Sequence, residues 1–142
     1  VRFYNLDNEP DLWFDTHRDV RPTGWKCQAF LDDTVAYAAA VKAADPSAQL
    51  LGPVVSGWTY YFYSAYDAQQ QNWGRRTDCL DGGSPLDFVP WYLQHLKQRE
   101  PDTGRLLDYL DLHYYPQASG VSLTPAGSAA TQALRLRSTR SR

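Results

Sequence analysis

The chain has 142 residues, a length that suits a single domain with a sizeable hydrophobic core. Its formal net charge is −2 and 21% of its residues are charged, so the composition does not favour a nucleic-acid partner. Five Trp and ten Tyr are many for this length, and because their side chains combine a flat apolar face with a polar tip, we expect some of them to line a wet binding cleft.

The first predicted unit is a strand followed by a loop and a helix. The strand covers residues 1–6 and ends near Asn8, and the loop continues from Glu9 to about Cys27. Apolar residues at helical spacing then predict a helix with one buried stripe, formed by Leu31, Val35, Ala38 and Val41. Asp45-Pro46 ends this helix, because the residue before a proline is pushed out of the helical region.

The second unit begins with a strand over residues 49–55, whose Pro53 is tolerable only near a strand end. A long loop over residues 57–83 follows and is rich in aromatic residues between Trp58 and Trp73. Sugar rings stack on aromatic faces, so this loop is a candidate wall of a cleft, with Trp58 as its substrate contact. The alternative is that half or more of these aromatic residues only pin the loop to the body of the domain.

The helix after this loop is predicted to begin at Ser84. Ser84 suits its N-cap, Pro85 its first helical position and Asp87 the third residue of a capping box. Its buried stripe is predicted to consist of Leu86, Val89, Leu93 and Leu96. Glu100-Pro101 is predicted to end it.

The third unit is a strand over residues 107–115, followed by an Ala-rich helix from Thr124 to about Arg137. His113 and Tyr115 fall on one face of this strand, close to its end. There they can reach the same edge as Glu9, form hydrogen bonds with sugar hydroxyls and hold a carboxylate in its charged form. Taken alone, His113 is equally well explained as a satisfied core histidine.

The alternation of strands and helices predicts an α/β fold with parallel strands. The long loops follow the strands, at the face where (β/α)8 barrels carry their active sites. Three units are too few to close a barrel and leave bare edges on the two outer strands. The sequence therefore predicts a fragment of such a barrel.

Glu9 is the candidate catalytic residue, because it stands where a buried strand opens into a loop, with Asn8 before it and Trp13 after it. Many enzymes that cleave sugars present an acid/base carboxylate in this way. Retention of configuration requires a second carboxylate about 5–5.5 Å away, and the chain offers no convincing partner. For an isolated Asn-Glu-Pro, a surface turn would be the better explanation.

Other chemistries find little support. Cys27 and Cys79 lack the spacing of a zinc site, and no cofactor or metal is expected. The two cysteines form one disulfide if the protein is secreted, or remain two unpaired thiols; the sequence supports both equally. No signal peptide or membrane-spanning run is recognisable, and no partner other than a substrate is indicated.

Several stretches together resemble glycoside hydrolase family 44, the endoglucanase and xyloglucanase family whose catalytic domain is a (β/α)8 barrel. The resemblance covers nearly the whole chain and rests on Tyr4-Asn5-Leu6-Asp7-Asn8-Glu9-Pro10-Asp11-Leu12-Trp13, Thr16-His17-Arg18-Asp19-Val20, Asp45-Pro46-Ser47-Ala48, Gly52-Pro53, Gly57-Trp58 and Leu110-Asp111-Leu112-His113-Tyr114-Tyr115-Pro116-Gln117-Ala118. The first stretch is quite specific, whereas Asn-Glu-Pro alone is shared by many related families.

The resemblance implies a role for each matched element. Glu9 corresponds to the general acid/base at the end of barrel strand four, and Asn8 to the amide that contacts the sugar 2-hydroxyl. The stretches from Gln49 and Leu107 correspond to strands five and six. The nucleophile of the family, a Glu at the end of strand seven, lies beyond this chain, so residues 1–142 are expected to be a partial catalytic domain that is inactive alone.

The resemblance also implies what the whole protein does. We expect a secreted, monomeric endo-β-1,4-glucanase that hydrolyses cellulose-like or xyloglucan-like polysaccharide with retention, without contact with nucleic acid or membrane. Glu9 is expected to be catalytic, and Asn8, Trp13, Trp58, His113 and Tyr115 are expected to bind substrate. The alternative is a non-catalytic carbohydrate-binding or degenerate barrel fragment.

Overall fold

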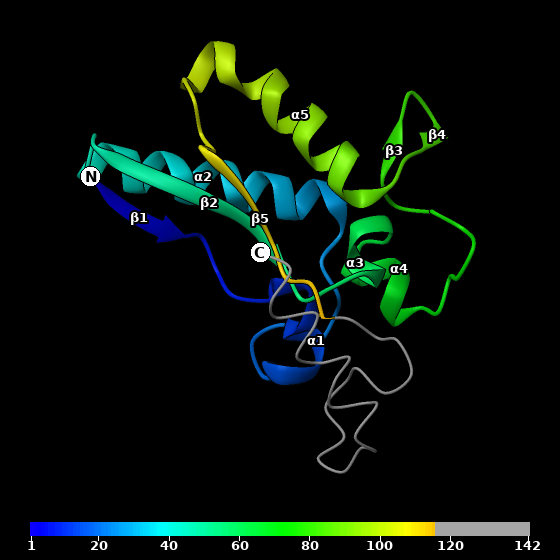
Figure 1. Cartoon of the computed structure of the whole chain (residues 1–142). Helices are drawn as coiled ribbons and strands as arrows, with labels where there is room; N and C mark the ends of the chain where they lie inside the picture. The colour runs from blue at the N-terminus through cyan, green and yellow to red at the C-terminus, as the bar shows by residue number, and fades with distance from the viewer. Residues whose placement is uncertain (116–142) are drawn as a thin grey trace, which may run out of the picture.

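Three parallel strands form the central sheet of the computed structural model, which describes residues 1–115 (Figure 1). The strands are β1 (Arg2–Asn5), β2 (Ala48–Val55) and β5 (Tyr109–Leu112), and they lie in the order β1-β2-β5. Helix α2 (Cys27–Ala44) connects the first two, and α5 (Phe88–Thr103) precedes the third. This arrangement confirms the predicted mixed α/β fold with parallel pairing. The predicted helix from Thr124 lies outside the described residues.

The two long helices pack together on one face of the sheet, where the core lies. The core takes Leu31 and Ala38 from α2, Leu50 from β2 and Tyr92 from α5, all buried. The predicted α2 stripe is confirmed, with Val35 and Val41 partly buried against this core. Full burial of one such aliphatic side chain stabilises the fold by about 1.5–3 kcal/mol, so this helical face holds the helices on the sheet.

The opposite face of the sheet is open within the described residues. Phe3 is 61% exposed there and contacts the exposed Tyr109, with 5.9 Å between ring centroids. The Asn5 side-chain amide donates to the Asp111 carboxylate at 3.3 Å across the same face. Apolar side chains on an uncovered sheet face indicate a surface that further structure would cover.

The parallel register brings the carboxyl ends of all three strands to one edge. Asn5 pairs with Leu51, Leu51 with Tyr109, and the pairing slips between Pro53 and Val55, close to the end of β2. Pro53 is therefore near a strand end, as predicted. The segments that follow the strands consequently gather at this one edge.

The beginning and end of α5 differ from the prediction. Ser84–Pro85 form strand β4, which pairs antiparallel with β3 (Leu80–Asp81), so the helix begins at Phe88 instead of Ser84. Asp87 occupies the N-cap position, but its carboxylate forms an ion pair with Arg76 instead of a capping bond. The helix then continues through residue 101 to Thr103 and ends at Gly104, whose φ of 72° suits glycine.

The buried stripe of α5 also differs in part. Val89 and Leu96 are buried as predicted, but Leu93 is 37% exposed. Phe88, Trp91 and Tyr92 fill the core in its place. The prediction was wrong at position 93 because Tyr92, one residue earlier, fits the helical spacing between Val89 and Leu96 equally well and is the residue that faces the core.

The segment predicted as one long loop contains two short helices, α3 (Thr59–Phe62) and α4 (Ala65–Gln69). The Ser64 hydroxyl caps α4 by accepting the backbone N–H of Asp67 at 3.0 Å. The buried Asp67 carboxylate in turn accepts bonds from the backbone N–H and hydroxyl of Thr77. Ser64-x-x-Asp67 is a capping signal that the sequence analysis missed.

Cys27 and Cys79 form a disulfide, which settles the alternative that the sequence left open. Their Cα atoms are 5.4 Å apart, and the two cysteines are 52 positions apart in the sequence. The bond ties the start of α2 to the segment before β3, and both cysteines are buried in the core. The Asp78 carboxylate next to it accepts the backbone N–H of Cys27 at 2.8 Å, and burial raises the pKa of Asp78.

Asp108 links the start of β5 to β2 and α2. Its Oδ2 accepts the Leu50 backbone N–H at 2.8 Å and pairs with Lys42 Nζ at 2.7 Å. Burial alone would raise the pKa of Asp108, but the hydrogen bonds from Lys42 and Leu50 outweigh it and hold the pKa below its usual 3.8. The ionised carboxylate is therefore favoured by the folded state.

This lowered pKa predicts a pH dependence of stability. A carboxyl whose pKa falls on folding stabilises the fold above its unfolded pKa, and that contribution is lost as the pH falls through the folded pKa. In the complete protein, we expect Asp108→Asn to lower the midpoint of urea unfolding clearly at about pH 7 and much less below about pH 3. Lys42→Met should show the same convergence, whereas a constant deficit at both pH values would contradict this role.

No helix within residues 1–115 has the combined length and apolar character of a membrane span.

Candidate active site

Glu9 lies just beyond the end of β1 in an unusual backbone conformation. Its φ of 54° and ψ of 52° place it in the left-handed region, directly before a 3-10 turn, η1 (Pro10–Leu12), and a short helix, α1 (Trp13–Thr16). Its backbone N–H donates to the Val54 carbonyl at 2.9 Å, and its carbonyl accepts the Leu12 N–H at 3.0 Å. A glutamate persists in this region only where the surrounding structure enforces it.

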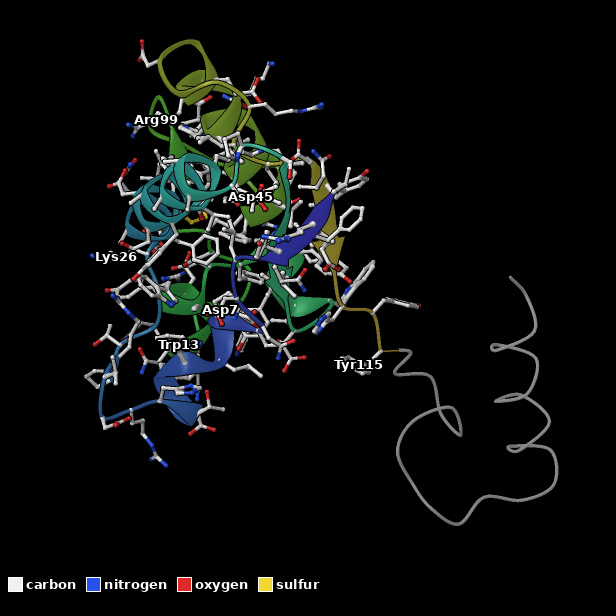
Figure 2. All side chains as sticks on the ribbon, turned by 90° about the vertical axis from the view of Figure 1, so that its left-hand side faces the viewer. Asp7, Trp13, Lys26, Asp45, Arg99 and Tyr115 are labelled. Atoms are coloured by element: carbon white, nitrogen blue, oxygen red, sulfur yellow. A yellow bond between two sulfur atoms is a disulfide. The ribbon has the colours of Figure 1, made fainter. Side chains whose placement is uncertain are left out.

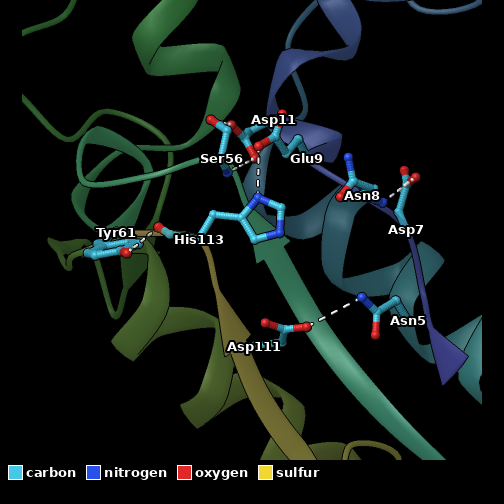
Figure 3. A network of polar contacts seen from close by, with 9 residues as sticks. All are labelled: Asn5, Asp7, Asn8, Glu9, Asp11, Ser56, Tyr61, Asp111 and His113. Carbon is cyan, nitrogen blue, oxygen red and sulfur yellow. Dashed lines mark hydrogen bonds and ion pairs between the residues drawn. The ribbon is translucent and has the colours of Figure 1, made fainter. Parts of the chain in front are cut away.

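The Glu9 side chain meets His113, which follows β5. Glu9 Oε1 and His113 Nδ1 are 2.7 Å apart, and each side chain is 25% exposed (Figure 3). The His113 backbone N–H donates to the Val55 carbonyl at 3.1 Å, which continues the sheet and fixes the position of the ring. The sequence prediction that His113 reaches the same edge as Glu9 is therefore confirmed.

A second carboxylate, Asp11, lies behind Glu9 and is only 4% exposed. Its Oδ1 accepts the Ser56 backbone N–H at 2.9 Å, and its Oδ2 accepts the Ser56 hydroxyl. Burial raises the pKa of Asp11 in spite of these bonds, and the nearby Glu9 adds to the shift. The sequence analysis did not identify Asp11 or Ser56, although Asp11 stands only two residues after Glu9.

Helix α3 is tied to the end of β5 by Tyr61. The Tyr61 hydroxyl donates to the His113 carbonyl (Figure 3). The Tyr61 ring also packs edge-on against Trp58, with 5.8 Å between the ring centroids. Burial raises the pKa of Tyr61 as well. In the neighbouring Tyr60, burial and the charges of Asp11 and Asp15 raise the pKa to about 12, so its phenol stays protonated.

An open groove of about 390 Å³ lies beside the Glu9–His113 pair. It is lined by Ser56, Gly57, Trp58, Thr59, Tyr60 and Tyr115. Trp58 and Tyr115 are 60% and 54% exposed, and the Tyr115 ring stands at 89° to that of His113. The groove therefore offers two accessible aromatic faces next to the histidine that contacts Glu9.

Asn8 and Trp13, the remaining predicted substrate-binding residues, do not line this groove. Asn8 is exposed beside Glu9, and its backbone N–H donates to Asp7 Oδ1 at 2.7 Å (Figure 3). Trp13 lines a separate cavity of about 400 Å³ with Trp25, and Figure 2 shows it apart from Tyr115. The structure thus groups Glu9, Asn8, His113, Trp58 and Tyr115 at one edge, and it does not bring Trp13 into the groove.

The part of the chain that the structure describes contains one cluster of residue types that could hold a metal ion, namely Cys27, Asp78 and Cys79. Because the two sulfur atoms are joined to each other, they present no thiolate to a metal. This cluster is therefore not a candidate metal site.

Comparison with known proteins identifies the relatives of the chain. The sequence model of glycoside hydrolase family 44 matches residues 1–118. A beta-mannanase/endoglucanase A of Caldicellulosiruptor saccharolyticus is 39% identical over 121 residues, which are 84% of this chain and 8% of that protein. The chain thus spans less than a tenth of that relative.

Solved structures match almost the whole chain. CelM2, a bifunctional glucanase-xylanase from a metagenome library, is 43% identical with a TM-score of 0.82, and the match covers 99% of this chain and 27% of CelM2. A family 44 xyloglucanase of Paenibacillus polymyxa, solved with xyloglucan, is 32% identical with a TM-score of 0.75 over the same shares of the two chains. The chain corresponds to about a quarter of each of these proteins.

Proposed function

The chain belongs to glycoside hydrolase family 44, and from this premise we propose that the protein containing it is a retaining endo-β-1,4-glucanase. Its substrate would be a plant polysaccharide of the cellulose or xyloglucan class. The observation that carries the proposal is the Glu9–His113 contact of 2.7 Å at the strand ends, beside an open groove with two exposed aromatic rings. An acid/base carboxylate needs such a place between structured protein and substrate.

In the proposed reaction Glu9 works twice. In the first step its carboxyl group protonates the oxygen of the departing sugar while a carboxylate nucleophile attacks the anomeric carbon and forms a glycosyl-enzyme intermediate. In the second step the Glu9 carboxylate removes a proton from the incoming water, which attacks the same carbon and releases the sugar with its original configuration. The two steps leave Glu9 in its starting state.

The neighbouring side chains have supporting roles in this proposal. His113 orients the Glu9 carboxyl group through their shared hydrogen bond. Trp58 and Tyr115 stack against sugar rings in the groove, and Asn8 donates to a sugar hydroxyl. Trp13, which lies in the other cavity, would reach a substrate only if the polysaccharide also extends over that side.

The nucleophile is assigned to a part of the protein outside this chain. Asp11 is the carboxylate packed behind Glu9, but it is 4% exposed and both of its oxygens are bound by Ser56, so it does not face a substrate. A retaining pair needs a second accessible carboxylate about 5–5.5 Å away. We therefore expect residues 1–142 alone to show no hydrolysis.

The incomplete sheet supports the assignment of the chain to barrel strands four to six. In the described residues β1 and β5 each have one neighbouring strand, and Phe3, Tyr109 and Leu110 are exposed beside them. Bare edges and apolar faces of this kind are covered when a barrel closes. Residues 1–142 would then be a partial catalytic domain that depends on the rest of the barrel for stability.

The disulfide and the relatives support a proposal for the compartment in which the protein works and for its partner. Disulfides persist in oxidising compartments, so the Cys27–Cys79 bond supports secretion. We propose that the full-length enzyme is a secreted monomer whose partner is a polysaccharide, with neither nucleic acid nor membrane involved. The names of the relatives include glucanase, xylanase and xyloglucanase, which supports a β-1,4-linked backbone.

The exposed Trp58 gives a testable prediction about substrate binding. Trp58→Ala should weaken binding, because a sugar ring stacks on a flat apolar face that alanine does not offer. We expect KM for xyloglucan to rise about tenfold, the equivalent of about 1.4 kcal/mol. Its kcat should change much less, since the ring is remote from proton transfer. Trp58→Phe should recover most of the affinity, and equal KM values for Ala and wild type would contradict the stacking role.

The test of the proposed function is an assay of the complete protein on carboxymethylcellulose and xyloglucan. New reducing ends and an NMR signal for the β-anomer as first product would support retaining hydrolysis. Binding of xyloglucan without any new reducing ends would instead support the alternative, a non-catalytic carbohydrate-binding protein that uses the aromatic groove.

A further inference from the structure

Asp11 is a buried carboxyl group for which the proposed reaction has no use. It is 4% exposed, and burying a carboxyl group costs free energy unless hydrogen bonds compensate. Here the largest compensation comes from Ser56, which donates both its backbone N–H, at 2.9 Å, and its hydroxyl. The two residues are 45 positions apart, so this contact joins the segment after β1 to the segment after β2.

The contact completes a two-sided attachment of Glu9. On one side, the Glu9 backbone N–H donates to the Val54 carbonyl at 2.9 Å. On the other, Asp11 is bound by Ser56, and Figure 3 shows both residues next to the Glu9 side chain. Between these attachments Glu9 keeps a φ of 54°, which a glutamate does not adopt by preference.

We propose that Asp11 and Ser56 are positioning residues that hold the Glu9 carboxyl group in its proton-transfer orientation. Asp11 is too buried to touch a substrate, so its effect passes through the backbone turn that it anchors. Without the anchor Glu9 can relax to a negative φ, which would redirect its side chain away from His113. This inference rests on the proposed function, in which Glu9 is the acid/base.

Two aryl β-cellobiosides with the same sugar test this role in the complete protein. The phenyl glycoside has a leaving group with a pKa of about 10 and needs an acid, whereas the dinitrophenyl glycoside leaves without one. For Asp11→Asn we expect kcat/KM to fall about 30- to 100-fold with the phenyl glycoside and by no more than about threefold with the dinitrophenyl glycoside. Azide should raise kcat of the variant, because it replaces water without needing a general base.

Two further variants keep the test decisive. Ser56→Ala retains the backbone bond to Asp11, so we expect the same selectivity with a smaller loss, about three- to tenfold, and this variant decides the question if Asp11→Asn does not fold. Asp67→Asn is the matched control, since it removes another buried, hydrogen-bonded carboxylate, and it should show no selectivity between the two glycosides.

The outcomes separate this inference from the proposed function. Equal losses on the two glycosides for Asp11→Asn, with Glu9→Gln strongly selective, would overturn the positioning role and leave Glu9 as the acid/base. If Glu9→Gln itself showed no selectivity, the proposed function would fail first. Selective loss in both Asp11→Asn and Ser56→Ala would support the inference.

Discussion

Glu9→Gln is expected to reduce xyloglucan hydrolysis by the complete protein about a thousandfold, within the 10²–10⁴-fold range of general acid–base catalysis. The amide has the same size and can keep the contact with His113, but it has no proton to give to the leaving oxygen and does not accept one from water. Reducing-end assays of kcat and kcat/KM measure the effect. Binding of xyloglucan should be nearly unchanged, since the groove residues remain.

The chain offers a matched control for this substitution. Glu100 is the only other glutamate, it lies on α5, and it pairs with Lys97 of the same helix instead of with a residue around Glu9. Glu100→Gln should leave hydrolysis unchanged. With dinitrophenyl cellobioside as substrate, azide should restore the turnover of Glu9→Gln, because azide attacks the glycosyl-enzyme intermediate without a general base. The product should be a glycosyl azide. Undiminished hydrolysis by Glu9→Gln would place the acid elsewhere.

Removing the disulfide is expected to have the second large effect. The cross-link closes a loop of 52 residues, and closing a loop of that length removes conformational freedom from the unfolded chain worth about 4 kcal/mol at 25 °C. Both cysteines belong to the same buried cluster as Leu31 and Phe88, so the bond also lies within the core that joins α2 to α5. A double variant, Cys27→Ala with Cys79→Ala, should therefore lower the free energy of unfolding by about this amount.

Urea denaturation of the complete protein, with and without a reductant, measures this contribution. Reductant should lower the stability of the wild type to that of the double variant and should leave the double variant unchanged. A wild type whose denaturation midpoint does not respond after full reduction, confirmed by thiol counting, would contradict a stabilising role for the bond.

Local sequence patterns were sufficient for the elements whose buried residues repeat regularly. The helix over 27–44 follows from apolar residues at helical spacing, and the strands near residues 2 and 48 follow from short apolar runs bounded by turn residues. Ser84-Pro85-Leu86-Asp87 misled the prediction because it resembles a helix start. Pairing of Ser84–Pro85 with Leu80–Asp81 and the ion pair of Asp87 with Arg76 instead delay the helix to Phe88.

The sequence by itself determined the family, the parallel α/β arrangement and the placing of Glu9 and His113 at the same edge, because parallel strands bring their carboxyl ends to one edge whatever lies between them. Only the tertiary structure decided that Cys27 pairs with Cys79, that Ser56 binds Asp11, and that Trp13 faces a separate cavity. Such contacts join residues about 50 positions apart and depend on how loops pack, so they leave no periodic pattern in the sequence.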